Sequence, residues 1–155
     1  MRKQYQNRAL YIHETTRLGV GDMDRYNAAF GEHFQPAMER LDARLLAHWQ
    51  GSPVNSSWPE ITTIWEIDGY AHLGDIGAAR SGHGERNGGF TEWEKTLAEL
   101  QGSGEGRFCY ANNAIKLASE LIAENFDASV VIQEIMTTKP GCQEDYIEQL
   151  EYAYV

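Results

Sequence analysis

The chain carries one histidine in a strand-like segment where its side chain could do chemistry. His13 lies within residues 10–18, and alternation along a strand places it on the same face as Tyr11 and Arg17. An imidazole there can act as a general acid or base, or as an axial ligand to haem iron. The alternative is a histidine that hydrogen-bonds at the surface of a sheet. Glu14 points to the opposite face, so a proton partner for His13 must come from another strand or chain.

A pair of glutamates, Glu14 and Glu134, occupies matching places in a repeated pattern. Residues 11–34 align without a gap with residues 131–154 at a shift of about 120 positions, which indicates a duplicated strand-turn-helix unit. If the two units close on each other, the two carboxylates would lie near a pseudo-twofold axis and could share a proton or a cation. A structural salt bridge is the alternative. The second copy carries Gln133 where the first carries a histidine, so a site built on the histidine would be asymmetric.

Aromatic side chains are the candidates for the wall of a binding pocket. We expect a pocket for a small hydrophobic molecule to be lined by Tyr11, Arg17, Trp49, Trp65 and Tyr110. The alternative is that the tryptophans belong to the core or to an interface. The five histidines have none of the spacings of a zinc site, so we expect no metal.

The first strand must be followed by a turn and a helix that position these residues. Gly19 and Gly21 allow a tight turn, and Asp22 can cap the next helix. Apolar residues then recur every three or four positions from Met23 to Leu41, which predicts an amphipathic helix packed on a sheet. Pro36 lies inside this pattern and predicts a kink or break near residues 32–35.

The rest of the chain shows further strand and helix patterns. Strands are expected at residues 43–50, 60–67 and 129–137, with helices around residues 70–76, 91–100 and 108–122 and from Gln143 onward. A short strand around residues 117–122 is the alternative to the helix at 108–122. The glycine-rich residues 81–89 are expected to form a mobile loop or lid, and residues 139–141 a turn.

This order of elements is β-α-β-β-α-β followed by a helix, which predicts an α+β, ferredoxin-like fold. We expect residues 1–128 to form one ferredoxin-like module, and residues 129–155 to close it or to begin a second one. Helices cover one face of such a sheet, so the other face needs a cover. We therefore expect a homo-oligomer or a second polypeptide to complete the structure, through an interface above about 1,600 Å².

These segments resemble the NIPSNAP-like proteins of the dimeric α+β barrel superfamily. The resemblance rests on the first strand-turn-helix unit, on the strands ARLLAHWQ and EITTIWEI, and on TTKPG with its following helix. It covers roughly residues 10–75 and 130–154. It implies that this chain forms half of a barrel-shaped enclosure. Relatives in that superfamily include cofactor-free monooxygenases, isomerases and lyases as well as haem-binding proteins, so no cofactor is expected here, although haem is possible.

Composition limits the class of partner. The chain has 155 residues, a formal net charge of -10 and a pI near 4.9, which argues against a nucleic-acid partner. No apolar run is long enough for a membrane span, and no export signal is visible. Cys109 and Cys142 are isolated thiols, so a reducing cytoplasm is the simplest setting, with a disulfide between them as the alternative.

Two classes of function follow from these patterns together with what the resemblance implies. The first is a cofactor-independent enzyme of the isomerase, lyase or monooxygenase type, acting on a small hydrophobic substrate with His13 as acid or base. The second is a binding or interaction module without chemistry. A haem-binding barrel protein is a further alternative.

Overall fold

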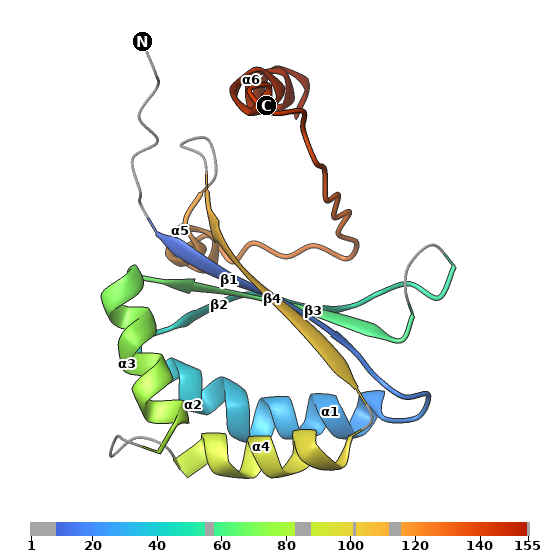
Figure 1. Ribbon diagram of the computed structural model, residues 1–155, viewed down its shortest axis with the longest axis vertical. Coiled ribbons are helices and arrows are strands. Elements are labelled where there is room, and N and C mark those ends of the chain that lie inside the picture. The colour runs from blue at the N-terminus through green and yellow to red at the C-terminus, as the bar shows by residue number, and fades with distance from the viewer. Residues whose placement is uncertain (1–8, 55–57, 83–87, 101, 112–115, 155) are drawn as a thin grey trace.

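The structure is a computed structural model that describes residues 9–54, 58–82, 88–100, 102–111 and 116–154. Within these residues, four antiparallel strands form one sheet in the order β2-β3-β1-β4. The strands are β1 (Leu10–Arg17), β2 (Arg44–Gln50), β3 (Glu60–Ile67) and β4 (Ser103–Tyr110). Helices α1 to α4 lie on one side of the sheet, and α5 and α6 on the other (Figure 1). The predicted α+β, ferredoxin-like fold is confirmed.

The central strand β1 has two differently used faces, as the sequence predicted. It pairs with β3 on one side and with β4 on the other over its whole length. Leu10 and Ile12 pack into the core under the helices, whereas Tyr11 and His13 point to the opposite, open face. Each residue of β1 therefore belongs either to the helix layer or to the open face.

The first helical segment is interrupted where the sequence predicted a break. It consists of α1 (Met23–Ala29), a π-helical turn η1 (Phe30–Phe34) and α2 (Gln35–Glu39). Pro36 has no N–H, and its ring would clash with the carbonyl group four residues earlier in a regular α-helix. The wider π turn relieves this clash, and the backbone N–H of Gln35 donates to the carbonyl oxygen of Phe30 instead.

The core lies between this helical segment, the sheet and two further helices, α3 (Tyr70–Arg80) and α4 (Gly88–Glu99). Aromatic rings dominate it, namely those of Tyr26, Phe30, Phe34, Trp65, Phe90 and Trp93. Helix α4 approaches η1 so closely that a Cβ atom on Gly89 would collide with the His33 carbonyl oxygen and lie 2.8 Å from the Cβ atom of Ala37. This close approach requires glycine.

Helix α5 (Ala118–Ala123) is attached to the open face through a buried carboxylate. Glu66 is 1% exposed, and it accepts hydrogen bonds from the Tyr11 hydroxyl at 2.6 Å, the Ala118 N–H at 2.7 Å and Arg44 Nε at 2.8 Å. These three donors satisfy a buried charge that would otherwise be costly. The last helix, α6 (Gln143–Tyr154), lies away from the sheet (Figure 1).

Two predictions for the C-terminal half were wrong. Residues 108–122 do not form one helix, because residues 103–110 pair with β1 as strand β4 and only residues 118–123 are helical. Residues 129–137, predicted as a strand, form no regular secondary structure. A strand needs a hydrogen-bonding neighbour, and both sides of β1 are already occupied by β3 and β4.

Other boundaries moved by small amounts. Helix α4 begins at Gly88 rather than at Thr91, and the turn before Gln143 is present as predicted. Most of the predicted loop or lid at residues 81–89 lies outside the described residues. In the part of the chain that the structure describes, no helix is both long enough and apolar enough to cross a membrane.

Candidate functional site

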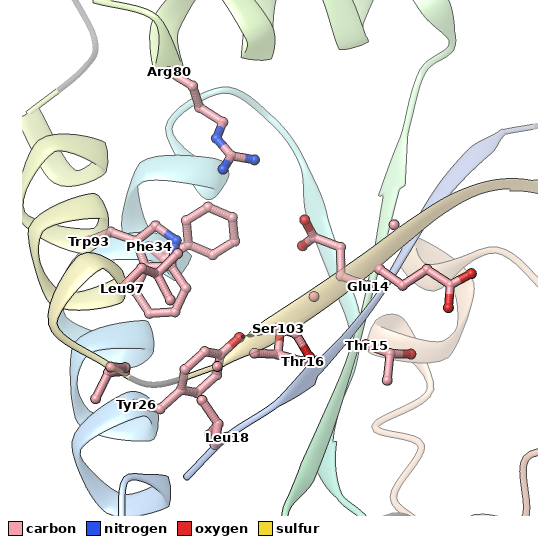
Figure 2. Close-up of a pocket in the computed structure, with 15 residues that line it drawn as sticks. Glu14, Thr15, Thr16, Leu18, Tyr26, Phe34, Arg80, Trp93, Leu97 and Ser103 are labelled. Atoms are coloured by element: carbon pink, nitrogen blue, oxygen red, sulfur yellow. Dashed lines mark hydrogen bonds between the residues drawn. The ribbon is translucent and has the colours of Figure 1, made fainter.

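A pocket of about 270 Å³ lies between the sheet and the helix layer. Its floor comes from β1 and from the start of β4, and its walls come from the helices (Figure 2). The lining residues whose side chains could act on a ligand are Glu14, Thr16, Tyr26, Phe34, Arg80 and Trp93. A pocket of this size suits a small molecule.

Glu14 is the acidic group that β1 directs toward the helices. It follows Ile12 on the face that packs into the core, so strand alternation alone places a carboxylate in an apolar surrounding. Burial raises the pKa of Glu14, and the positive charge of Arg80 opposes this in part. None of the described residues donates a hydrogen bond to this carboxylate, which is therefore available to a ligand.

Tyr26 supplies a neutral hydroxyl group beside the carboxylate. Its hydroxyl lies 3.4 Å from Thr16 Oγ1, and the residue is 4% exposed. Burial raises the pKa of Tyr26, the hydrogen bond to Thr16 lowers it, and the charge of Glu14 raises it further. The phenol therefore stays protonated at neutral pH and can donate a hydrogen bond.

Arg80 is the positive charge of the pocket. It stands at the end of α3, and its guanidinium carbon lies 5.6 Å from the centre of the Phe34 ring. Its ion pair with Glu94, among the described residues, is long at 3.9 Å. Phe34 and Trp93 stack with ring centres 5.0 Å apart and form an apolar wall next to this charge. The pocket thus combines a carboxylate, a phenol and a guanidinium with aromatic rings.

This arrangement supports proton transfer. A partly buried carboxylate whose pKa is raised by burial keeps its proton to a higher pH than an exposed glutamate, which suits it to accept a proton from a ligand and return it. A guanidinium and a phenol can stabilise negative charge that develops on a ligand oxygen. Strand alternation had set Glu14 opposite His13, and Tyr26 lies in the periodic apolar segment at residues 23–41. The sequence did not indicate that the Glu14 face lines the pocket, or that Arg80, some 66 residues from Glu14 along the chain, would join these residues.

His13, the predicted catalytic residue, lies on the open face and not in this pocket. Its Nε2 atom is 2.5 Å from the side-chain nitrogen of Gln133, so the amide donates and the imidazole nitrogen accepts. Gln133 is the residue that replaces the histidine in the repeated unit. The catalytic role of His13 stays a prediction, and it depends on what covers the open face.

The predicted pocket-lining residues divide between the two faces. Tyr11, Arg17 and Trp49 lie on the open face, where Arg17 pairs with Glu60 at 3.0 Å. Trp65 is fully buried under the helices, and its Nε1 atom finds no acceptor among the described residues. Tyr110 packs against Tyr70, with ring centres 6.4 Å apart. Within this chain, the five residues do not line one common pocket.

The two equivalent glutamates are also separated. Glu14 lines the pocket under the helices, whereas Glu134 lies exposed in the irregular segment that contacts His13 on the open face. A shared proton or cation between the two carboxylates stays a prediction.

The pocket does not fit haem. Among the described residues that line it, none is a histidine, a cysteine or a methionine, the usual axial ligands. Tyr26 is the remaining possible ligand, and its raised pKa disfavours the phenolate that iron would bind. The described residues also contain no cluster of three or more histidine, cysteine, aspartate or glutamate side chains that could hold a metal ion.

Comparisons with known proteins place the fold. No family model and no curated protein matches the sequence. Among solved structures, an uncharacterised NIPSNAP domain protein from Burkholderia xenovorans is similar, with a TM-score of 0.57, 14% identity, and coverage of 69% of this chain and 98% of that chain. A NIPSNAP family protein of unknown function from Agrobacterium tumefaciens matches with a TM-score of 0.56, 14% identity, and coverage of 70% and 92%. The resemblance seen in the sequence is thus confirmed at the level of the fold, and the chain has the fold of the NIPSNAP-domain proteins.

Proposed function

We propose that this protein binds a small, largely apolar molecule in the pocket between β1 and the helix layer, and that Glu14 exchanges a proton with it. The observation that carries the proposal is a carboxylate that faces an aromatic pocket and receives no hydrogen bond from the described residues. The reaction type is a cofactor-independent proton transfer, as in an isomerase or a lyase.

The cost of burying Glu14 supports a functional role. A carboxylate in an apolar surrounding destabilises a folded protein unless it is paired or protonated. Glu66 on the other face of the same sheet has three hydrogen-bond donors, whereas Glu14 has only the distant charge of Arg80. Perturbed and unpaired groups of this kind cluster at functional sites.

The other lining residues indicate the ligand chemistry. The stacked rings of Phe34 and Trp93 suit an apolar or aromatic body. Arg80 and the Tyr26 hydroxyl suit an oxygen that gains negative charge when Glu14 removes a proton nearby. The best match is a small aromatic or alicyclic molecule with an acidic C–H or O–H group next to a carbonyl oxygen.

Binding without chemistry is the second candidate. It is supported by the few proton acceptors of the pocket, because the second carboxylate that lines it, Glu105, is already hydrogen-bonded to Arg107. In that case Glu14 accepts a hydrogen bond from the ligand and no bond is broken.

The test uses a panel of phenols, aryl ketones and cyclic diketones, screened by backbone amide NMR against the 155-residue chain. We expect ligand-induced changes in amide chemical shift that are confined to β1, η1 and α4. Glu14→Gln should make these changes smaller, whereas the exposed control Glu32→Gln should not. For a ketone that binds, exchange of its α-hydrogens with deuterated water reports proton transfer. Exchange that Glu14→Gln abolishes supports the enzyme. Binding without exchange supports the second candidate. Ligand-induced amide shifts that are the same in Glu14→Gln as in the wild type contradict both candidates.

A further inference from the structure

Three polar side chains form a row across the helix-facing side of the sheet. Glu14 of β1 is paired with Thr63 of β3, and Thr63 is paired in turn with His48 of β2. The three strands are neighbours in the order β2-β3-β1. Directly paired residues of adjacent strands point to the same face, with their Cβ atoms about 5 Å apart. Thr63 therefore lies between the proposed proton carrier and a histidine.

The ring of His48 is held in one orientation and one protonation state. It stacks on Phe30, with ring centres 3.8 Å apart. Its Nε2 atom lies 3.1 Å from the side-chain oxygen of Asn27 on α1, and its Nδ1 atom lies 2.9 Å from Thr63 Oγ1. An amide oxygen can only accept, so Nε2 carries the proton. Burial lowers the pKa of His48, which keeps the imidazole neutral at neutral pH, so Nδ1 accepts the hydrogen bond that the Thr63 hydroxyl donates.

This hydrogen bond accounts for a donor that Glu14 lacks. Thr63 is 2% exposed, and a threonine hydroxyl has a single proton to donate. That proton goes to His48 on one side of β3 and not to Glu14 on the other side. The pair Tyr11 and Glu66, also directly opposite each other on β1 and β3, behaves differently, because there the hydroxyl donates to the carboxylate at 2.6 Å.

We propose that His48 is a positioning residue, which accepts the hydroxyl proton of Thr63 and thereby keeps that hydroxyl from donating to Glu14. The inference rests on the proposed role of Glu14, and it gives the reason why this carboxylate stays free for a ligand. A carboxylate that accepts a hydrogen bond is stabilised in its charged form and is a weaker base. His48 does not line the pocket, so it acts on the basicity of Glu14 only through Thr63.

The first test is the tautomer of His48 in the wild-type protein, determined from the nitrogen NMR chemical shifts of the imidazole ring above neutral pH. We expect a protonated Nε2 and an unprotonated Nδ1. A proton on Nδ1 would make the Thr63 hydroxyl the acceptor and would overturn the proposal. This test needs no substitution, so it decides even where a variant fails to fold.

The second test is a double-substitution cycle on the pKa of Glu14, measured by carbon-detected NMR titration of its carboxyl group. His48→Phe keeps an aromatic ring against Phe30 but offers no acceptor, so the released Thr63 hydroxyl is expected to donate to Glu14. In this background, Thr63→Val should raise the pKa of Glu14 by about one pH unit, because a hydrogen bond to the charged form is lost. With His48 present, Thr63→Val should have a clearly smaller effect on this pKa.

Thr62→Val is the matched control for the loss of a buried hydroxyl. Thr62 is 6% exposed, but it is paired with Thr15 and Trp49 on the open face, so its substitution should leave the pKa of Glu14 unchanged in both backgrounds. An equal effect of Thr63→Val with and without His48 would overturn the proposal, as would the absence of an effect in both. An ordinary pKa of Glu14 in the wild type would instead contradict the proposed function, and the cycle would still decide the role of His48.

Discussion

At the scale of single residues, Glu14 links the sequence pattern to the pocket. Its burial follows from alternation, because it shares a strand face with Leu10 and Ile12, which pack into the core. Glu66 is buried more completely, at 1% exposed, but it has three donors and holds α5 in place. Two glutamates in one sheet therefore have different roles because their hydrogen-bond partners differ.

The pKa of Glu14 predicts how stability depends on pH. Burial raises the pKa of the folded-state carboxyl above its unfolded value. At a pH below the unfolded-state pKa, the Glu14 carboxyl is protonated in both states and does not lower the free energy of unfolding. As pH rises through the window between the two pKa values, the cost of burying the charge appears, and it is complete above the folded pKa. Urea unfolding at low and neutral pH should therefore show wild type losing stability relative to Glu14→Gln as pH rises. A constant difference between the two proteins would contradict this, with Glu32→Gln as the control for loss of one charge.

His13→Gln tests the open face at the same scale. His13 makes one hydrogen bond, to Gln133, and a glutamine side chain can also accept from that amide. We expect the free energy of unfolding to change by less than about 1 kcal/mol. If His13 is catalytic, turnover of a substrate is lost while stability is kept. Turnover at the wild-type rate would remove His13 from the mechanism and leave Glu14 as the proton carrier.

At the scale of elements, close packing of α4 on η1 fixes one wall of the pocket. Gly89 allows this approach, and a methyl group there meets the His33 carbonyl oxygen and the Cβ atom of Ala37. Both are rigid atoms. The wall formed by Trp93 on α4 therefore depends on a glycine located one turn earlier in the same helix.

Alanine scanning of helical glycines checks this packing. Gly89→Ala should lower the free energy of unfolding by about 1–3 kcal/mol, because α4 must move. Gly77→Ala in α3 is the control, since a Cβ atom at Gly77 meets nothing within 4 Å. That variant should be stabilised by about 0.5–1 kcal/mol through the unfolded state. Equal effects of the two substitutions in chemical denaturation would show that α4 does not pack as described.

The hydrogen bonds of Glu66 to α5 predict that Glu66→Gln and Glu60→Gln differ in their effect on stability. Glu66→Gln should lower the free energy of unfolding by roughly 2–4 kcal/mol. The reason is that an amide presents an N–H, in place of an accepting oxygen, to part of the three donors. Glu60→Gln breaks the largely exposed pair with Arg17 and should cost less than about 1 kcal/mol. Amide exchange in residues 118–123 should accelerate in the first variant alone. Unchanged exchange there would mean that Glu66 does not anchor α5.

Elements that are determined by their own local sequence were predictable. The alternation of apolar and polar residues at 60–67 predicted the strand that the structure has. Pro36 predicted the interruption of the first helical segment. Residues 103–110 were not predictable, because two glycines and mixed polarity give no strand signal and only pairing with β1 makes them a strand. Residues 129–137 have the opposite behaviour, with a strong strand pattern and no strand neighbour among the described residues. Of the candidate site, Glu14 was foreseeable, whereas the contribution of Arg80 depends on tertiary packing.

At the scale of the whole molecule, the sheet separates two surfaces with different roles. The helix side holds the pocket with its carboxylate, and the open side carries His13, α5 and the C-terminal segment (Figures 1 and 2). The proposed chemistry therefore uses one face of the sheet, and the cover expected from the sequence would use the other. Substitutions on the open side, such as Val130→Lys at an 80% exposed position, should not alter the ligand-induced amide shifts of the pocket residues.

The most direct measurement of the central claim is a carbon-detected NMR titration of the Glu14 side-chain carboxyl. The account predicts a pKa above that of an ordinary glutamate, because desolvation dominates. It also predicts a further rise in Arg80→Gln, since the charge of Arg80 lowers this pKa. A pKa at or below the ordinary value would mean that Glu14 is solvated or ion-paired, and would contradict a partly buried carboxylate that is available to a ligand.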